Sequence, residues 1–174
     1  MLAENLGNVF ELALELAYDC EQHLIDHLPK MTDAACSEPL RESLEQYMDQ
    51  TKEHRARLEK VFAALDRAPG AEHNPVIRGI TGEGEKLIKH IDRSPLLDAV
   101  LIMHANQIAH YEIALYESLV SFARTLSLQD TAELLEQTWG EEKIAAQALT
   151  RIAEHSVNRE AALFQNTPHI FPLV

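Results

Sequence analysis

The chain has 174 residues, which is enough for one domain with its own hydrophobic core and short for two. Hydrophobic residues make up 46% of it and charged residues 25%, as in globular proteins, and no apolar run reaches the roughly 18 residues that a membrane span needs. The formal net charge of −13 argues against binding to nucleic acid, because phosphate recognition needs clustered Lys and Arg.

The N-terminus and the cysteines indicate the compartment. The first ten residues, MLAENLGNVF, lack the basic and then apolar segments of a secretory signal. Cys20 and Cys36 lack the C-x-x-C spacing of a zinc or redox motif. We therefore expect a cytoplasmic protein whose two thiols are reduced.

Helical periodicity dominates the chain from its start, and strand signals are almost absent. Apolar residues three and four positions apart predict a first helix from Phe10 to Met31, with Pro29 loosening its end. A second helix follows Ser37 as N-cap and a first-turn proline, and its apolar stripe runs to Leu65.

The middle of the chain interrupts this pattern. Residues 68–93 are rich in Pro and Gly and form the longest irregular stretch, within which we expect one short helix over residues 83–91. This stretch is the long connection between the second helix and the next one.

Two more long helices follow. The third begins at Ser94 as N-cap before a proline, and its seam runs from Ala105 to Phe122. A short turn then leads to the fourth helix, where Asp130 and Glu133 have the spacing of a capping box.

Two helical hairpins joined by a long crossover have the connectivity of ferritin-like bundles. We therefore predict an all-α fold over residues 1–164: an antiparallel four-helix bundle with a long crossover between helices two and three and a short extra helix. Residues 165–174 contain two prolines and are expected to form an extended tail.

Four ionisable residues interrupt the apolar seams, one on each long helix: Glu21, His54, Glu112 and Glu142. Counted from the start of each helix, their depths agree within about one turn at 1.5 Å per residue. Burying a lone carboxylate costs several kcal/mol unless it is paired, protonated or bound to a cation. Three carboxylates and one imidazole at one depth suit an iron or manganese site.

Other interpretations stay open. No Glu-x-x-His pair occurs on the second or fourth helix, so the ligand set typical of di-iron bundles is incomplete. Each inward glutamate could instead pair with Arg57 or Lys143, or contact one of the tyrosines Tyr18, Tyr47, Tyr111 and Tyr116. Among the other histidines, His104 and His110 flank the third seam and are ambiguous. The rest are expected at the surface or in the tail: His23, His27, His73, His90, His155 and His169.

Four segments together resemble the YciE/YciF family of ferritin-like stress proteins: AYDCEQHLIDHLPKM, DQTKEHRARLEKVF, IAHYEIALYESL and EQTWGEEKIAAQAL. The resemblance covers roughly residues 8–155. It implies a rubrerythrin-like bundle that forms a homodimer, in a family without an established reaction. The resemblance also places the family's glutamates of helices one, three and four at Glu21, at Glu112 within His-Tyr-Glu, and at Glu142.

The chain departs from that family pattern at several positions near these glutamates. Gln50 and Ala109 stand where many members have Glu, Ala146 replaces an acidic residue, and His54 stands where many have Gln. The remaining ligands therefore fit one metal ion, or two held weakly.

Two functions are consistent with this pattern. The first is a stress-related protein that binds one or two iron or manganese ions at mid-bundle, with oxidase- or peroxidase-like activity. The alternative is a metal-free, non-enzymatic helical dimer with a structural or interaction role. Iron storage with DNA protection is disfavoured, because it needs a cage and usually a basic tail, and the tail QNTPHIFPLV is neutral.

Overall fold

The computed structural model describes residues 4–164. Within this range the chain is helical and contains no strand, as predicted. Its elements are α1 (Leu6–Ala34), α2 (Glu38–Ala64), α3 (Pro75–His90), α4 (Pro95–Thr125), α5 (Gln129–Ile152), the π-helical turn η1 (Ala153–Val157) and α6 (Asn158–Leu163). The predicted tail over 165–174, and His169 with it, lie outside the described residues.

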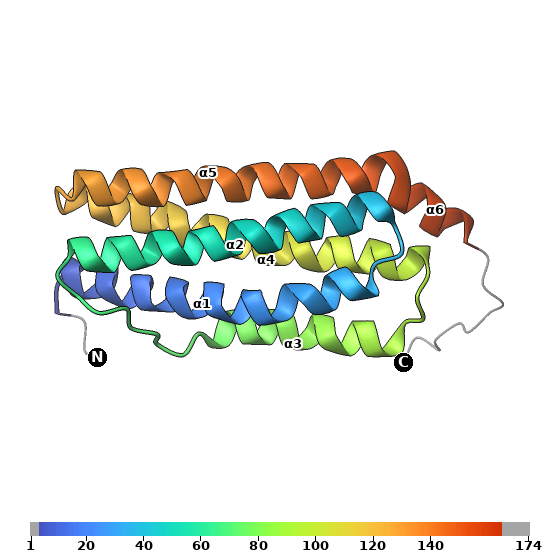
Figure 1. Ribbon diagram of the computed structural model, residues 1–174, viewed down its shortest axis with the longest axis horizontal. Helices are drawn as coiled ribbons and strands as arrows, with labels where there is room; N and C mark the ends of the chain where they lie inside the picture. The colour runs from blue at the N-terminus through green and yellow to red at the C-terminus, as the bar shows by residue number, and fades with distance from the viewer. Residues whose placement is uncertain (1–3, 165–174) are drawn as a thin grey trace.

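The four long helices α1, α2, α4 and α5 lie side by side as a bundle (Figure 1). Short connections join α1 to α2 at one end and α4 to α5 at the other, so each pair is an antiparallel hairpin. The crossover from α2 contains α3, which lies along the outside of the bundle against α4 and α1. The predicted fold is confirmed.

The extra helix is longer than predicted. It occupies Pro75–His90 instead of residues 83–91, because Asn74 caps it: the Asn74 side chain accepts hydrogen bonds from the backbone N–H groups of Val76 and Ile77. Pro75 then stands at the first helical position, where its missing N–H costs nothing. Three of the glycines that suggested an irregular stretch, Gly79, Gly82 and Gly84, lie inside this helix.

The other predicted helix ends agree in part with the structure. Ser94 caps α4 with its side chain, and α1 continues through Pro29 to Ala34. The capping box at Asp130 is wrong: α5 begins at Gln129 after Leu128, which places Asp130 inside the first turn. A carboxylate there interacts favourably with the positive end of the helix dipole.

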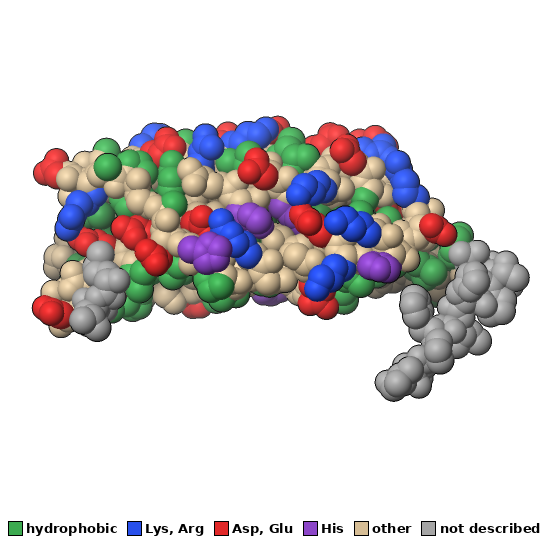
Figure 2. Space-filling view, turned by 90° about the horizontal axis from the view of Figure 1, so that it is seen from below, with side chains coloured by type: hydrophobic (Ala, Val, Ile, Leu, Met, Phe, Trp, Pro, Cys, Tyr) green, Lys and Arg blue, Asp and Glu red, His purple; other side chains and the backbone are tan. Residues whose placement is uncertain are grey.

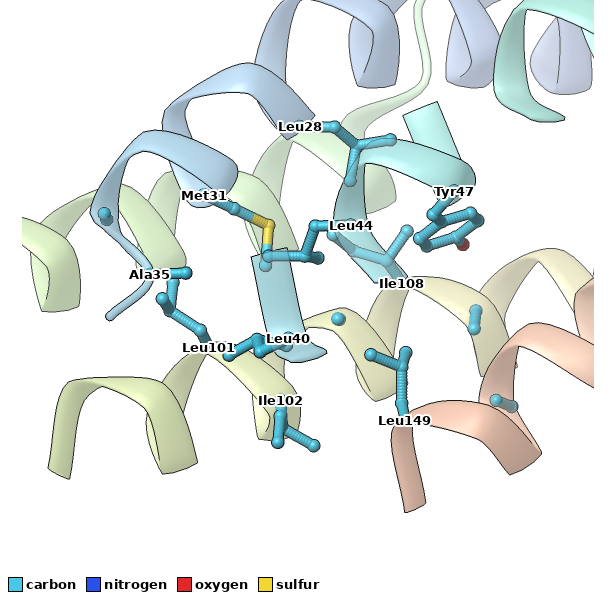
Figure 3. Close-up of a cluster of buried hydrophobic side chains, with 14 of the residues drawn as sticks. Leu28, Met31, Ala35, Leu40, Leu44, Tyr47, Leu101, Ile102, Ile108 and Leu149 are labelled. Carbon is cyan, nitrogen blue, oxygen red and sulfur yellow. The ribbon is translucent and has the colours of Figure 1, made fainter. Parts of the chain in front are cut away.

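The hydrophobic core consists of two clusters. One fills the end of the bundle next to the α1–α2 connection (Figure 3), where side chains from all four long helices meet, among them Leu28, Met31, Leu44, Leu101, Ile108 and Leu149. The other fills the opposite end, with Phe10, Leu14, Leu58, Phe62, Leu119 and Leu135. The region between these clusters positions the candidate site.

The surface carries positively and negatively charged side chains. Lys and Arg alternate with Asp and Glu on the face seen from below, where histidine side chains also gather (Figure 2). In the part of the chain that the structure describes, no helix combines the length and the apolar character that crossing a bilayer requires.

Candidate metal centre

The four ionisable seam residues meet between the two hydrophobic clusters. On α1, Ala17 lies one turn before Glu21 and belongs to one cluster, and Leu24 lies one turn after Glu21 and belongs to the other. The same change of cluster occurs across the level on α2, α4 and α5. Glu21, His54, Glu112 and Glu142 are all 0% exposed, so the prediction that they are buried is confirmed.

His54 lies at the centre of this group. Its Nδ1 atom is 3.3 Å from Glu142 Oε1 and 3.8 Å from Glu21 Oε1. Its ring therefore brings residues of α1, α2 and α5 to one point, and Glu112 of α4 joins them through a tyrosine.

Tyr47 is that tyrosine. Its hydroxyl lies 2.6 Å from Glu112 Oε2 and 2.9 Å from Glu142 Oε2. A single O–H group can donate to only one of two carboxylates. A protonated Glu112 that donates to the Tyr47 oxygen, while Tyr47 donates to Glu142, satisfies both contacts.

A second tyrosine completes the cluster. The Tyr116 hydroxyl donates to Glu21 Oε1 at 2.5 Å. Tyr116 is buried one turn beyond Glu112 on the seam of α4, where the apolar pattern favoured Leu115, which is only half-buried. The other two candidate tyrosines lie elsewhere, since Tyr18 donates to Glu59 and Tyr111 accepts from Asn74.

Glu141 also belongs to the cluster, although the sequence pattern did not predict it. Its Oε2 atom lies 2.9 Å from His54 Nε2, and Arg57 donates to both of its oxygens at 2.9 and 3.2 Å. Arg57 therefore pairs with Glu141. The alternative in which Arg57 pairs with one of the inward glutamates is wrong. The available signal was the Glu-Glu doublet at 141–142, which places a second carboxylate beside the seam.

Burial changes the protonation of the carboxylates. It raises the pKa of Glu21 to about 7, although the charge of His54 opposes this rise. Burial and the charges of Glu142 and Glu21 raise the pKa of Glu112 well above its usual range. Glu112 therefore holds a proton at neutral pH, in agreement with its contact to Tyr47.

The histidine has the opposite tendency. Burial by itself lowers the pKa of His54, but hydrogen bonds to Glu141 and Glu142 and the charge of Glu21 together raise it to about 10. The hydrogen bond to His54 is in turn the main cause that lowers the pKa of Glu141 to about 2, and Arg57 adds to it. His54 is thus a buried imidazolium held between carboxylates.

Three polar atoms of the cluster are buried without a hydrogen bond of good geometry: Glu21 Oε2, His54 Nδ1 and Glu142 Oε1, of which the last two face each other as an ion pair at 3.3 Å. Such atoms are rare in folded proteins and require a cause, for which a bound ion is one candidate. Carboxylate oxygens with one imidazole nitrogen are a donor set for iron or manganese. The residues present therefore fit such an ion.

The ligands are not already arranged around an ion. Within residues 4–164, no three side chains of His, Cys, Asp or Glu are placed as a ready-made metal site. Tyr47 and Tyr116 hold one oxygen of each of the three inward glutamates. Cys20 lies at the edge of the cluster with its Sγ atom 4.0 Å from Glu112, and both cysteines are free, as expected.

The histidines outside this cluster include one error of prediction. His27 was expected at the surface, but it is 1% exposed, and so is the ambiguous His104. Their Nε2 atoms are 3.1 Å apart beneath α3. Only the packing of α3 on α1 and α4 buries them, and the sequence pattern of α1 alone does not show that packing.

Comparisons with known proteins agree with the fold. A family model described as a domain of unknown function (DUF892) matches residues 5–162. YciF of Escherichia coli is 28% identical over 162 residues, which cover 92% of this chain and 98% of YciF. The crystal structure of YciF, described as a stress protein, superposes with a TM-score of 0.86 at 27% identity and covers 90% of this chain and 99% of that one. YcfI of Rhodopseudomonas palustris, for which a structural role has been suggested, gives 0.81 at 30% identity over 84% of this chain and 94% of YcfI.

Proposed function

The chain belongs to the DUF892 family, as its resemblance to YciF indicated, and on that premise we propose that it is a stress-related protein that binds iron or manganese in its carboxylate–histidine cluster. The observation that carries the proposal is the convergence of three buried atoms on Glu21, His54 and Glu142, none of which makes a hydrogen bond of good geometry. Glu112 supplies a fourth side chain once it releases its proton.

The contact between His54 and Glu141 supports this assignment. Metal-ligating histidines usually donate their second N–H to a carboxylate, which fixes the tautomer and the orientation of the ring. His54 Nε2 faces Glu141 at 2.9 Å, and Nδ1 faces Glu21 and Glu142 inside the bundle. His54 would therefore use Nδ1 as its metal ligand.

Protonation couples to binding in a definite direction. Ligands must be deprotonated to bind a metal, and the proposed set holds protons on His54, on Glu112 and in part on Glu21. Loading the site therefore releases protons from the bundle interior. A bound iron or manganese ion would supply redox chemistry toward oxygen or peroxide, which is the basis of an oxidase- or peroxidase-like activity.

The number of ions is limited by the residues around the cluster. Ala109 and Ala146 are buried in the neighbouring hydrophobic cluster and present methyl groups where further carboxylates would complete a two-metal site. One ion, or two held weakly, suits the four ligands.

A second function, a metal-free helical dimer with a structural role, is favoured by a different observation. The hydroxyls of Tyr47 and Tyr116 bind the inward glutamates without any metal, so a protonated cluster can persist as part of the core. Under either function we propose a cytoplasmic homodimer.

Metal analysis separates the two functions. Protein purified without chelator from cells supplied with iron and manganese is analysed by mass spectrometry for metals, together with Glu112→Gln and, as a control, Glu45→Gln on the exposed side of α2. Metal binding predicts near-stoichiometric iron or manganese in the unsubstituted chain and the control, and a large loss in Glu112→Gln. Equally low metal in all three supports the structural function.

A further inference from the structure

We propose that the protein has a second transition-metal site, for a late divalent ion such as Zn²⁺ or Cu²⁺, formed by His23, His27 and His104 where α1, α3 and α4 meet. These ions prefer imidazole nitrogen, in contrast to the oxygen-rich cluster at mid-bundle. The proposal rests on a histidine cluster that the first site does not use.

The two sites are separate. His27 follows Glu21 by six residues on α1, and His104 precedes Glu112 by eight on α4, which corresponds to about 9 and 12 Å along the helices at 1.5 Å per residue. Both shifts are toward the end of the bundle that α3 covers. A ligand of one site cannot serve the other.

His27 and His104 already have the spacing of two ligands. Their Nε2 atoms are 3.1 Å apart, and both side chains are 1% exposed. Two imidazoles on one ion, each with a bond of about 2.0–2.1 Å, place their nitrogens about 3.0–3.4 Å apart. The ring centroids are 5.3 Å apart, so the rings meet nearly end to end and share one N–H···N hydrogen bond when no metal is bound. When His104 carries its proton on Nδ1 in place of Nε2, a tilt of both rings directs the two Nε2 lone pairs to a common ion.

His23 supplies the third nitrogen. It stands four residues before His27 on the same face of α1, with the two rings nearly parallel at 10° and their centroids 6.4 Å apart. Two histidines at this spacing on a helix are the zinc ligands of the H-E-x-x-H motif. His23 Nε2 now contacts the Thr81 hydroxyl at 2.7 Å, so it reaches the ion only after its ring rotates. Its half-buried position gives the ion a path from solvent.

The second nitrogen of His27 faces a carboxylate, the kind of group that usually orients a metal-ligating histidine, at a distance longer than a hydrogen bond. His27 Nδ1 is buried, has no hydrogen-bond partner, and faces Glu85 Oε1 at 3.8 Å. Lys30 holds the same Glu85 oxygen at 2.6 Å. A proton on Nδ1 that points to this carboxylate leaves Nε2 as a lone pair, the tautomer that a metal needs.

The surroundings also keep the two rings neutral and make room for them. Burial lowers the pKa of His27 to about 4 and lowers the pKa of His104. Neither ring therefore has to lose a charge before it binds a cation at neutral pH. Gly84 of α3 lies directly over His104: a Cβ atom at this position would be 2.1 Å from His104 Nε2.

Electron paramagnetic resonance of Cu²⁺ tests the site, because the hyperfine pattern counts bound nitrogens. One equivalent of Cu²⁺ is added to the chelator-treated full-length chain, to His27→Gln and His104→Gln, and to two controls. His155→Gln alters a histidine exposed at η1, and Glu112→Gln alters the mid-bundle cluster. We expect two or three nitrogens in the unsubstituted chain and both controls, and at least a tenfold weaker Zn²⁺ affinity by calorimetry in the two inner variants.

A nitrogen count that His155→Gln lowers, and that His27→Gln and His104→Gln leave unchanged, would overturn the proposal in favour of surface binding. Glu112→Gln keeps this test independent of the first site. Circular dichroism establishes that each variant is folded. If an inner variant does not fold, His23→Gln replaces it: loss of one nitrogen supports the three-histidine site, and an unchanged spectrum and affinity reject it.

Discussion

His54 and Glu141 are joined by a contact of 2.9 Å between Nε2 and Oε2, although the two residues belong to different helices and only His54 is fully buried. This contact decides which ring nitrogen faces the interior. It also connects the buried cluster to Arg57 near the surface, since Arg57 binds Glu141 through both oxygens.

Glu141→Gln is expected to weaken metal binding without removing a ligand. Outer carboxylates that orient a ligating histidine are worth about 10- to 100-fold in affinity, and we expect a loss in that range for iron or manganese. Titration of the metal-free variant with Mn²⁺ measures it. Glu133→Gln, an exposed change on the same helix, is the control. An affinity that Glu141→Gln leaves unchanged would contradict the orienting role of Glu141.

Glu21→Gln is expected to stabilise the metal-free protein in alkaline but not in acidic solution. The pKa of Glu21 is about 7 in the folded chain and 4.5 in its ordinary state, so the folded state binds the proton more tightly. Its contribution to stability is therefore greatest below pH 4.5 and is lost as the pH rises through 7, by about 3 kcal/mol at most. Urea unfolding at pH 5 and pH 8 measures the difference. A variant that is no more stable than the unsubstituted chain at pH 8 would show that Glu21 is not destabilised by burial.

His27 makes the protein sensitive to acid. Its pKa is about 4 in the folded chain against the ordinary 6.5, so the unfolded chain binds the proton more tightly. The stability from this residue is complete above pH 6.5 and is lost as the pH falls through 4, by about 3 kcal/mol at most. We expect His27→Gln to lose less free energy of unfolding than the unsubstituted chain between pH 7 and pH 4.5. His155→Gln should keep the original dependence, and equal slopes for all three proteins would refute the prediction.

Two glycines of α3 make a matched pair. A Cβ at Gly84 would meet the buried His104 ring at 2.1 Å, and a Cβ at Gly79 would meet nothing within 4 Å. Replacing glycine by alanine inside a helix gains roughly 1 kcal/mol where space allows, whereas overpacking a filled site costs about 1–3 kcal/mol. The midpoint temperature of thermal unfolding should therefore be higher for Gly79→Ala, and lower for Gly84→Ala, than for the unsubstituted chain. In a chain that already carries His104→Ala, Gly84→Ala should cost less stability than in the unsubstituted chain, and an equal cost in both would mean that the ring is not the obstacle.

The sequence predicted the bundle and the level of the cluster because both depend on repeating patterns within single helices. Glu21 and Glu142 interrupt apolar stripes, and counting residues along a helix measures depth directly. Tyr116 was named among the tyrosines that could contact a glutamate, but the apolar pattern placed Leu115 on the seam in its stead, because Leu115 satisfies the same pattern at a neighbouring position. Side-chain type alone does not decide which of two adjacent residues turns inward.

The histidine pair shows what single-helix patterns leave out. The burial of His27 depends on where the crossover places α3. The extent of α3 was itself underestimated, because Gly79, Gly82 and Gly84 suggested a loop, whereas the Asn74 cap and Pro75 begin a helix. Contacts between distant segments, not local preference, determine this part of the molecule.

The layer of ionisable residues between the two hydrophobic clusters has a further consequence, with or without a metal. If any one long helix slid along its axis by a single turn of about 5.4 Å, its glutamate or histidine would move in among leucines and lose its partners. The layer therefore fixes the register of the four helices, because any packing in which one helix is shifted along its axis is destabilised. Apolar seams alone tolerate such shifts, so these four residues help to select one alignment from several that are otherwise similar in energy.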